Sequence, residues 1–570
     1  MRCIFFLVTV LIFFSTSSEA QKHDNIWMNG NYNNFYIDFN DLRPNIYTVS
    51  SEYDFLLTMN FLCNFNGTPA FYSNGCSVMN ANHELMHNGE FLLPNDYDCD
   101  KYRYKRMTHG GGVTLPSFDE GKFIMFNISV DLPLPAQPCE FNRLVAHHID
   151  ITAQQGKGEV VSNGQVILTG CFQEPSATRH ANGRDWWILM PDNKIDRFYR
   201  WLLTPTGLEG PWEQSIVNPT IDGLTYRGWS EFSRDGQRYL IKGARKGVAM
   251  YEFDRCTGML SQPRFFEQSG VWNLSASFSS NGDLFYAVSD NTFKLWQYDL
   301  TAADVDASKV LLGEWDGTKD TFNIPAAFGY IQHAPDGRMY IWGGGSALMH
   351  LIEFPDRKGD NCKLRQYAIQ LPGSCPGPSL YYPNYRLGPI DGSACDTLGI
   401  DNLPVALFRY DMEDTLSPLQ QTFTDLSYYE PDTWFWDFGD GTQSQEKDPV
   451  HSFPAPGTYT VCLTASNANA SDTYCRQVTV GTVGIEALPA LPHVQVSPNP
   501  FSGELRVQLP ALVGVSPRFV LYDLYGREVQ TAWLRDFDTY IPLSQLPAGM
   551  YVWQLRWNGV ATQSGRVVKH

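Results

Sequence analysis

The sequence predicts an all-β fold that is divided among several domains. Aromatic residues make up 14% of the 570 residues and charged residues only 18%, while 47 Gly and 35 Pro provide frequent chain reversals. This composition favours many short strands over long helices. Hydrophobic cores stop growing near ~250 to 300 residues, so a chain of this length is expected to contain at least two domains.

The N-terminal residues are typical of a secretory signal peptide. Arg2 supplies a positive charge, residues 4–14 are apolar except for Thr9, and Ser18-Glu19-Ala20 places small residues at the cleavage positions. We therefore expect residues 1–20 to be removed. No later stretch reaches the ~20 consecutive apolar residues of a membrane-spanning helix, so no transmembrane segment is expected in the mature chain.

The formal net charge of -19 argues against a nucleic acid as the partner. A surface that binds phosphates needs clustered Lys and Arg side chains, and no basic stripe occurs in the sequence. We expect any ligand of the exported protein to be an extracellular glycan or protein.

Residues 24–396 carry a loose repeat in which an Asn-Gly or Asp-Gly pair precedes a strand-like run. The pairs are Asn66-Gly67, Asn163-Gly164, Asn182-Gly183, Asp235-Gly236, Asn281-Gly282 and Asp336-Gly337. The last four glycines lie 53, 46 and 55 residues apart, which suits a four-stranded blade. Two of the turns share the template Phe-Ser-x-Asp/Asn-Gly, at residues 232–236 and 278–282. The region resembles the WD40/YVTN-like β-propeller superfamily, which implies six or seven radially stacked blades.

Residues 404–482 follow a different pattern. Trp434, Trp436 and Phe438 alternate along one predicted strand and share a face, and Gly439-Asp440-Gly441 follows as a tight turn. The motifs W-x-F-G-D-G at 436–441 and H-x-F-x-x-x-G-x-Y-x-V at 451–461 closely resemble those of a PKD domain, an Ig-like β-sandwich. The resemblance implies a spacer or an interaction module.

A linker rich in Gly, Ala, Pro and Leu, residues 483–493, separates this domain from residues 494–570. Five elements then follow in order, at residues 497–501, 505–507, 520–527, 546–553 and 565–569. They resemble the type A C-terminal sorting domain of the type IX secretion system of Bacteroidetes. The resemblance implies a small β-sandwich that the type IX secretion machinery recognises, and export through the periplasm to the outer cell surface or the extracellular space.

The string His83-Glu84-Leu85-Met86-His87 matches the zinc-peptidase motif H-E-x-x-H. On a helix it would place two imidazoles on one face, with Glu84 as the general base. Residues 80–90 contain three Asn and a Gly between strand-like runs, which disfavours that helix. We therefore predict a loop between strands, no catalytic residue and no zinc here.

The segment His180-Ala181-Asn182-Gly183-Arg184-Asp185-Trp186-Trp187 is the candidate ligand-binding site. His180, Arg184, Asp185, Trp186 and Trp187 could line the central funnel of a propeller and hold a glycan or a peptide. In the alternative interpretation Arg184 and Asp185 form a pair, while the two tryptophans point to opposite sides of the strand and pack between blades.

The carboxylates of Asp437 and Asp440 raise the question of Ca²⁺, a cation that prefers oxygen ligands. Aspartates in such turns more often accept backbone hydrogen bonds, so no cofactor is predicted.

Eleven of the 12 Cys residues remain after removal of the signal peptide, in an oxidising setting where disulfides persist. Cys462 and Cys475 flank the turn at residues 467–470 symmetrically, so they would face each other in a hairpin and form a disulfide. Cys362, Cys375 and Cys395 are near enough in sequence to be further candidates.

These observations predict a secreted or cell-surface protein that binds without catalysis. The propeller would be the recognition platform, the PKD-like domain a spacer and the C-terminal domain the export signal. The alternative is a secreted hydrolase for peptides or glycans, with its site on one propeller face, because a propeller supports either function.

Overall fold

The computed structural model describes most of the chain after the expected signal peptide. The described residues are 21–30, 34–49, 60–90, 92–93, 99, 112–129, 141–216, 230–243, 247–267, 273–289, 293–374, 382–413, 417–481, 494–508, 518–523, 527–534, 538–557 and 560–570. The predicted signal peptide (1–20) and linker (483–493) lie outside them, as does Cys375.

Seven antiparallel sheets follow one another over residues 26–370, two with three strands and five with four. In chain order the sheets contain β1 (Ile26–Asn29), β2 (Asn34–Asp38) and β3 (Asn45–Val49); β4 (Asn60–Cys63), β5 (Pro69–Ser73) and β6 (Val78–Asn80); β7 (Val113–Pro116), β8 (Lys122–Ser129), β9 (Phe141–Asp150) and β10 (Glu159–Phe172); β11 (Ser176–Arg179), β12 (Trp186–Pro191), β13 (Arg197–Thr204) and β14 (Gly207–Ser215); β15 (Ser230–Phe232), β16 (Arg238–Gly243), β17 (Gly247–Asp254) and β18 (Met259–Glu267); β19 (Asn273–Phe278), β20 (Leu284–Ser289), β21 (Lys294–Asp299) and β22 (Val310–Glu314); β23 (Ile331–His333), β24 (Met339–Trp342), β25 (Leu348–Ile352) and β26 (Leu364–Gln370). The helical elements α2 (Ala153–Gly156) and the 3-10 turn η1 (Gly359–Cys362) are each four residues long.

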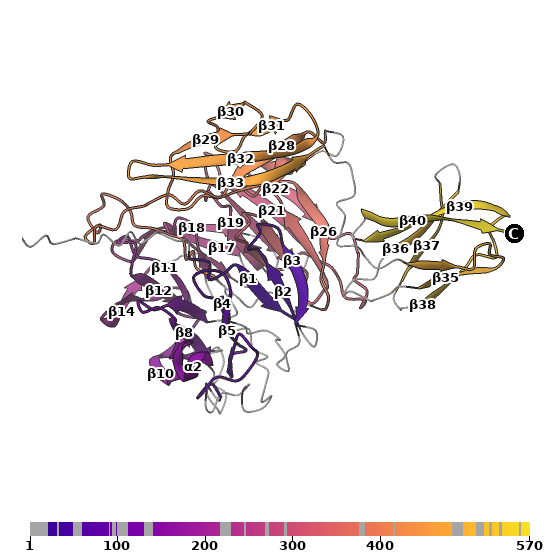
Figure 1. Ribbon diagram of the computed structural model, residues 1–570. Helices are drawn as coiled ribbons and strands as arrows, with labels where there is room; N and C mark the ends of the chain where they lie inside the picture. The colour runs from indigo at the N-terminus through magenta and orange to yellow at the C-terminus, as the bar shows by residue number, and fades with distance from the viewer. Residues whose placement is uncertain are drawn as a thin grey trace, which may run out of the picture.

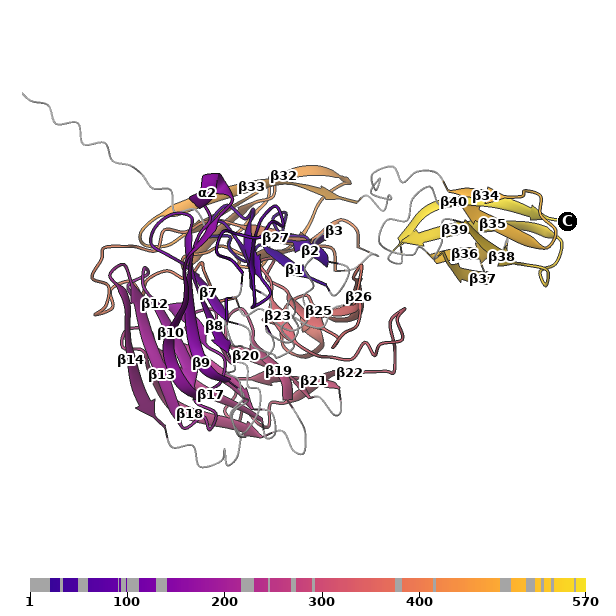
Figure 2. The ribbon, with the colours of Figure 1, turned by 90° about the horizontal axis from the view of Figure 1, so that it is seen from below.

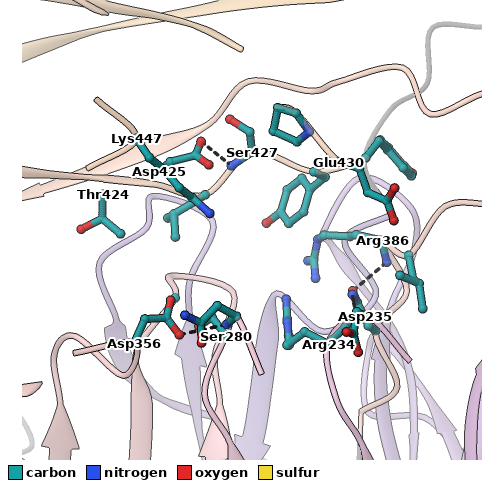
Figure 3. A pocket seen from close by; sticks show the side chains of 18 of the residues that line it. Arg234, Asp235, Ser280, Asp356, Arg386, Thr424, Asp425, Ser427, Glu430 and Lys447 are labelled. Atoms are coloured by element: carbon teal, nitrogen blue, oxygen red, sulfur yellow. Dashed lines mark hydrogen bonds between the residues drawn. The ribbon is translucent and has the colours of Figure 1, made fainter. Parts of the chain in front are cut away.

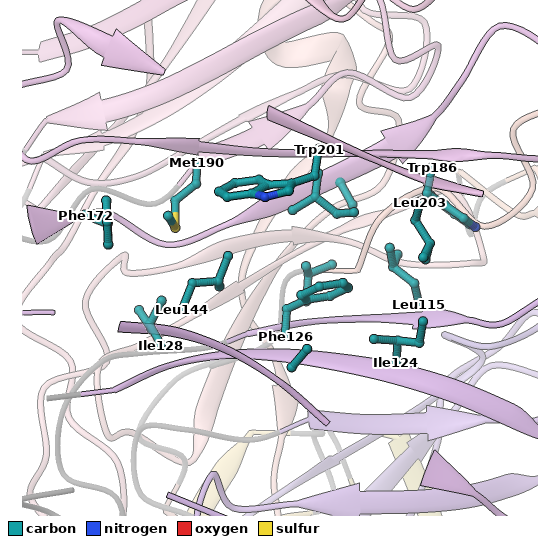
Figure 4. Packing of buried hydrophobic residues seen from close by; sticks show 14 of the residues in the cluster. Leu115, Ile124, Phe126, Ile128, Leu144, Phe172, Trp186, Met190, Trp201 and Leu203 are labelled. Atoms are coloured by element: carbon teal, nitrogen blue, oxygen red, sulfur yellow. The ribbon is translucent and has the colours of Figure 1, made fainter. Parts of the chain in front are cut away.

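The seven sheets form a closed ring, seen in Figures 1 and 2 as the indigo to salmon part of the chain. Each sheet shares a hydrophobic cluster with the next one, as in Figure 4, where Phe126 of β8 and Leu144 of β9 face Trp201 of β13. The ring closes because Trp27 of the first sheet packs on Trp342 of the seventh, with ring centroids 6.1 Å apart. The structure is therefore a seven-bladed β-propeller, within the six or seven blades that the resemblance implied.

The predicted Asn-Gly and Asp-Gly turns begin a new strand at five of the six sites. Their glycines adopt positive φ angles, for example +70° at Gly236 and +77° at Gly337, a conformation that disfavours other residues. The prediction is wrong for Asn163-Gly164, which lies inside β10. There His147 Nδ1 lies 2.8 Å from the Asn163 side-chain amide and 3.2 Å from the Gly164 nitrogen, and the strand bulges without turning.

Residues 408–480 form a two-sheet sandwich above the propeller, drawn in orange in Figure 1. One sheet contains β27 (Phe408–Asp411), β28 (Gln420–Asp425) and β31 (Val450–Ser452); the other contains β29 (Thr433–Asp437), β30 (Gln443–Ser444), β32 (Gly457–Ser466) and β33 (Ser471–Val480). Trp436 and Phe438 are buried in its core, as their alternation predicted, and Trp434 packs against that core while remaining partly exposed.

The disulfides agree only in part with the sequence predictions. Cys462 and Cys475 stand directly opposite each other in β32 and β33 and are bonded, which confirms that prediction. The grouping of Cys362 with Cys395 is wrong, because Cys395 is bonded to Cys256 and Cys362 is a buried free thiol. A further disulfide joins Cys76 and Cys99.

Residues 494–570 form a second sandwich that lies apart from the other sheets in both views (Figures 1 and 2). Its sheets contain β34 (Gln495–Ser497), β35 (Glu504–Gln508) and β38 (Asp538–Pro542), and β36 (Arg518–Tyr522), β37 (Glu528–Trp533), β39 (Gly549–Trp557) and β40 (Val560–Lys569). Phe519, Leu555 and Val567 are among the residues of its own core. The buried Lys569 ammonium donates to three backbone carbonyls, of residues 543, 544 and 546, which fastens the last strand to this loop.

No helix within the described residues has the length and apolar character needed to cross a membrane.

Candidate functional site

After the last blade the chain returns over one face of the propeller as an irregular segment, residues 382–396, which we call the strap. The Tyr382 hydroxyl donates to the Phe61 carbonyl in the second blade at 3.0 Å, and the Tyr385 hydroxyl donates to the Thr114 carbonyl in the third blade at 2.8 Å. Tyr382 also packs against the clusters between blades seven and one, one and two, and three and four. A side chain that reaches non-neighbouring blades must lie near the axis of the ring, so the strap fills the centre of the propeller.

Buried polar contacts hold the strap in place. Arg386 donates to Asp24 Oδ2 at 2.9 Å and to Asn25 Oδ1 at 2.5 Å, just before the first blade. Arg255 of the fifth blade, 1% exposed, donates to the backbone carbonyls of Arg179 and Gly388. The disulfide between Cys256 and Cys395 fastens the end of the strap to the same blade. The ring is therefore closed by a strap as well as by blade packing.

The PKD-like sandwich packs directly on the strap and on the turns of the propeller. Asp411 of β27 accepts hydrogen bonds from Arg338 of the seventh blade and from Arg409 beside it. Arg357 of the propeller lies 3.0 Å from Glu413 of the sandwich. Gly337 has a φ of +77°, and a Cβ there would lie 2.4 Å from Leu426 Cδ2, so this turn packs closely against the sandwich. The role of this domain as a spacer stays a prediction. Its contacts show that it packs against one face of the propeller.

A cavity of about 310 Å³ lies between the two domains, and we call it the interdomain cavity. Its propeller side consists of the turns around Arg234, Ser280 and Pro335, and its strap side of residues 384 and 386–388. The sandwich contributes residues 424–431, Trp434 and residues 447–448. Figure 3 shows side chains from both domains pointing into this space, with Asp425 and Glu430 above and Asp356, Arg234 and Arg386 below.

Five carboxylates and three cationic side chains line the interdomain cavity: Asp235, Asp356, Asp425, Glu430 and Asp448, against Arg234, Arg386 and Lys447. Desolvation between the two walls of the cavity raises the pKa of Asp356, Asp425, Glu430 and Asp448, although Asp356, Glu430 and Asp448 keep solvent-exposed surface. Burial also lowers the pKa of His333 to about 3, so that imidazole is neutral at physiological pH. Because Arg386 is already paired with Asp24, the cavity carries an excess of negative charge.

Two consecutive residues on the cavity wall have a strained backbone. Tyr429 and Glu430 have φ angles of +63° and +52°, a region that non-glycine residues rarely adopt. Each such residue costs about 1–3 kcal/mol and persists only where the surroundings enforce it. Here Asn467 Nδ2 donates to the Tyr429 carbonyl at 3.2 Å. Strain of this kind is common at ligand-binding sites, which makes the cavity the candidate site of this protein.

The residues proposed from sequence as a ligand site lie beside the strap. Arg184 Nε donates to Asp185 Oδ1 at 2.7 Å, and His180 Nε2 lies 3.1 Å from the Cys256 carbonyl. Trp186 packs with the third blade and Trp187 with the fifth, and they are 0% and 5% exposed. Both indole rings are therefore part of the packing between blades, and ligand binding by these five residues stays a prediction.

The H-E-x-x-H string does not form a helix. His83 has a φ of +64°, Leu85 bridges to Met79, and His87 bridges to Glu159 of β10. The predicted loop is confirmed, whereas its lack of catalytic activity stays a prediction.

Asp437 and Asp440 are engaged in their own turn. Asp437 accepts from the Gly439 amide at 2.9 Å, and Asp440 accepts from the Thr442 amide at 3.0 Å. Asp440 Oδ2 also lies 2.8 Å from His451 Nε2, which connects the two halves of the sequence motif. Among the described residues no group of three or more His, Cys, Asp or Glu side chains is arranged to hold a metal ion.

The sequence did carry a signal for the cavity residues, at the third position of the turn template. Arg234 and Ser280 occupy that position in the fifth and sixth blades, and Pro335 occupies it in the seventh. All three face the interdomain cavity. The signal was missed because the repeat was used only to count blades, and its variable position was not examined.

Family models match two parts of the chain, a PKD domain at residues 404–483 and a secretion system C-terminal sorting domain at residues 495–569. A search of curated proteins finds no match.

Three solved structures illustrate the similarity. The PKD1 domain of Vibrio anguillarum Epp is 31% identical, covering 14% of this chain and 95% of its own, with a TM-score of 0.13. The periplasmic gluconolactonase PpgL of Pseudomonas aeruginosa is 13% identical over 62% of this chain and 97% of its own, with a TM-score of 0.35. The β-propeller domain of Myceliophteria thermophila Cps50 (Swd1) is 11% identical over 59% of this chain and 93% of its own, with a TM-score of 0.32.

The chain therefore carries a β-propeller, a PKD domain and a secretion system C-terminal sorting domain in that order. The sorting domain indicates export by the type IX secretion system to the cell surface or the extracellular space.

Proposed function

We propose that this chain is a non-enzymatic binding protein, with the propeller as its recognition platform and the interdomain cavity as its ligand site. The observation that carries the proposal is the strained pair Tyr429 and Glu430 at the wall of a cavity of about 310 Å³. Ligand pockets of proteins have volumes of ~300 to 1,000 Å³, so the cavity is of sufficient size.

The strap explains why the site lies off the propeller axis. Tyr382 and Tyr385 fill the centre of the ring on the side of the PKD domain, where a propeller would otherwise offer a funnel. Three blade turns remain accessible beside the strap, and the PKD domain covers them with a second, polar wall. In this arrangement the PKD domain contributes to binding in addition to any role as a spacer.

The test measures how far a ligand stabilises the wild type, in which the cavity is open, and a variant in which a larger side chain fills the cavity. A ligand at 100 times its Kd raises the free energy of unfolding by about 2.7 kcal/mol. We expect members of a panel of peptides and oligosaccharides to raise the melting temperature of the wild type but not of Ser280→Trp, which fills the cavity from the turn of the sixth blade.

Gln237→Trp is the matched control, because Gln237 is an exposed residue of the corresponding turn in the fifth blade and does not line the cavity. Binding that survives Ser280→Trp would place the ligand elsewhere. Turnover of a peptide or glycan, or bound zinc that is lost in His83→Ala, would instead favour the secreted hydrolase.

A further inference from the structure

The interdomain cavity combines aromatic faces with accessible carboxylates. Trp434, Tyr428 and Tyr429 line it and are each partly exposed. Asp235, Glu430 and Asp448 are exposed at its edge. Aromatic rings pack against the C–H faces of pyranose sugars, and a carboxylate accepts two hydrogen bonds from neighbouring hydroxyl groups because it has two acceptor oxygens.

Glu430 is the carboxylate best placed for such a ligand. It protrudes beside Arg386 and Asp235 in Figure 3, and its strained backbone directs it into the cavity. The other carboxylates are partly engaged: Asp425 accepts from the Ser427 amide at 3.1 Å, and Asp448 accepts from the Asp425 amide at 2.7 Å. Asp448 Oδ1 alone makes that contact, so its second oxygen remains as an acceptor.

The charge of the cavity discriminates among ligands. Five carboxylates against three cations disfavour phosphates, acidic glycans and acidic peptides, since like charges across a site are costly. A cationic ligand meets a different obstacle. The Lys447 ammonium already lies 5.3 Å from the centroid of the Trp434 ring, beside Asp425 and Asp448, and occupies the position that an amine would take.

We propose, on the basis of the binding function above, that the interdomain cavity takes a neutral carbohydrate of one or two sugar rings, packed on Tyr429 and hydrogen-bonded by Glu430 and Asp448. The cavity volume of about 310 Å³ limits the ligand to the end of a chain or to a short oligosaccharide. The protein thereby binds uncharged sugars outside the cell.

The experiment is calorimetric titration of the full secreted cargo with two sets of oligosaccharides, each two to four residues long. One set is neutral, with gluco-, manno-, galacto- and xylo-oligosaccharides, and the other is anionic, with oligogalacturonates and heparin fragments. We expect at least one neutral sugar to bind. Glu430→Gln keeps the size of the side chain and should weaken that binding at least 10-fold.

Asp448→Asn should also weaken the binding, while Glu446→Gln, an exposed residue two positions away that does not line the cavity, should leave it unchanged. Anionic sugars that bind more tightly than neutral ones, or neutral binding that is unaffected by Glu430→Gln and Asp448→Asn, would overturn the proposal. A peptide that binds through Glu430 when no neutral sugar does would remove the carbohydrate assignment and leave the binding function intact. If neither class responds to the cavity variants, both proposals fail.

Discussion

Arg386 and Asp24 lie 362 positions apart in the sequence and form a buried ion pair in which the Arg386 guanidinium donates to Asp24 Oδ2 at 2.9 Å. The pair connects the strap to the residues just before the first blade. The first and seventh blades share no strand, so this ion pair adds to the hydrophobic cluster around Trp27 and Trp342 that joins the two ends of the ring.

Arg386→Met should therefore destabilise the propeller strongly. The substitution leaves the buried Asp24 carboxylate without its partner, and loss of one member of a buried pair costs ~3–5 kcal/mol. Guanidinium-induced unfolding measures the change. Arg197→Met is the matched control, since Arg197 and Glu213 form an exposed pair at 3.6 Å and its loss should cost less than about 1 kcal/mol. Equal effects of the two substitutions would contradict a role of Arg386 in closing the ring.

The repeated turns and the sorting domain were predictable because their signals are local. Phe-Ser-x-Asp/Asn-Gly specifies a turn within five residues, and Cys462 and Cys475 are 13 residues apart in one hairpin. The strap, in contrast, depends on contacts across the whole propeller. Cys256 and Cys395 are 139 residues apart, and no spacing in the sequence distinguishes that pairing from the wrong one with Cys362.

The interdomain cavity could not be predicted for a similar reason. Neither the propeller nor the PKD domain contains it alone, and its position follows from how Asp411 meets Arg338. The sequence placed Trp434 on the core face of its strand, yet at the edge of the sandwich that face reaches the cavity. Local patterns determine each domain, whereas the docking of two surfaces has no periodic signal.

Asp411→Asn should loosen the PKD domain from the propeller. Asp411 accepts from both Arg338 and Arg409, whose side chains are 10% and 2% exposed, so removal of its charge leaves two cations without their shared partner. A loss of ~2–5 kcal/mol is expected. Calorimetry should resolve separate transitions of the two domains in the variant. Asp401→Asn, at an exposed position before the sandwich, should melt like the wild type; one unchanged transition in both variants would refute the ion-pair docking.

Replacement of Cys462 and Cys475 by Ser should destabilise the PKD domain by ~2–3 kcal/mol, because the open chain regains the entropy that the closed loop removes. The measurement is chemical unfolding of the wild type and the double variant without reductant, so that the propeller disulfides Cys76–Cys99 and Cys256–Cys395 stay intact in both proteins. Non-reducing peptide mapping of secreted protein that finds both thiols free would rule out the bond in the native molecule.

Acid should destabilise the propeller through its buried histidines. Burial lowers the pKa of His350 from 6.5 to about 4 in the folded state. Between those values the unfolded chain binds a proton that the folded chain does not, so stability falls as the pH falls from 6.5 to 4. His350→Leu should reduce this slope by up to ~1.4 kcal/mol per pH unit. Urea unfolding at several pH values measures how the free energy of unfolding depends on pH. His87→Leu is the control, because His87 is exposed. Identical slopes in the wild type, His350→Leu and His87→Leu would exclude His350 as a cause.

The sorting domain is expected to be dispensable for folding and necessary for export. It has its own core, in which Phe519, Leu555 and Val567 are buried, and Lys569 is satisfied by carbonyls of the same domain. A domain with its own core can fold alone, so truncation after Gly484 should leave the melting temperature of the propeller and PKD domain unchanged. The truncated protein should accumulate in the periplasm, because it lacks the domain that the type IX secretion machinery recognises.

In the reciprocal experiment, residues 494–570 fused to a reporter with an N-terminal signal peptide should carry the reporter outside. Full secretion of the truncated protein would show that residues 494–570 are not needed for export, and a fusion that remains periplasmic would show that they are not sufficient for it.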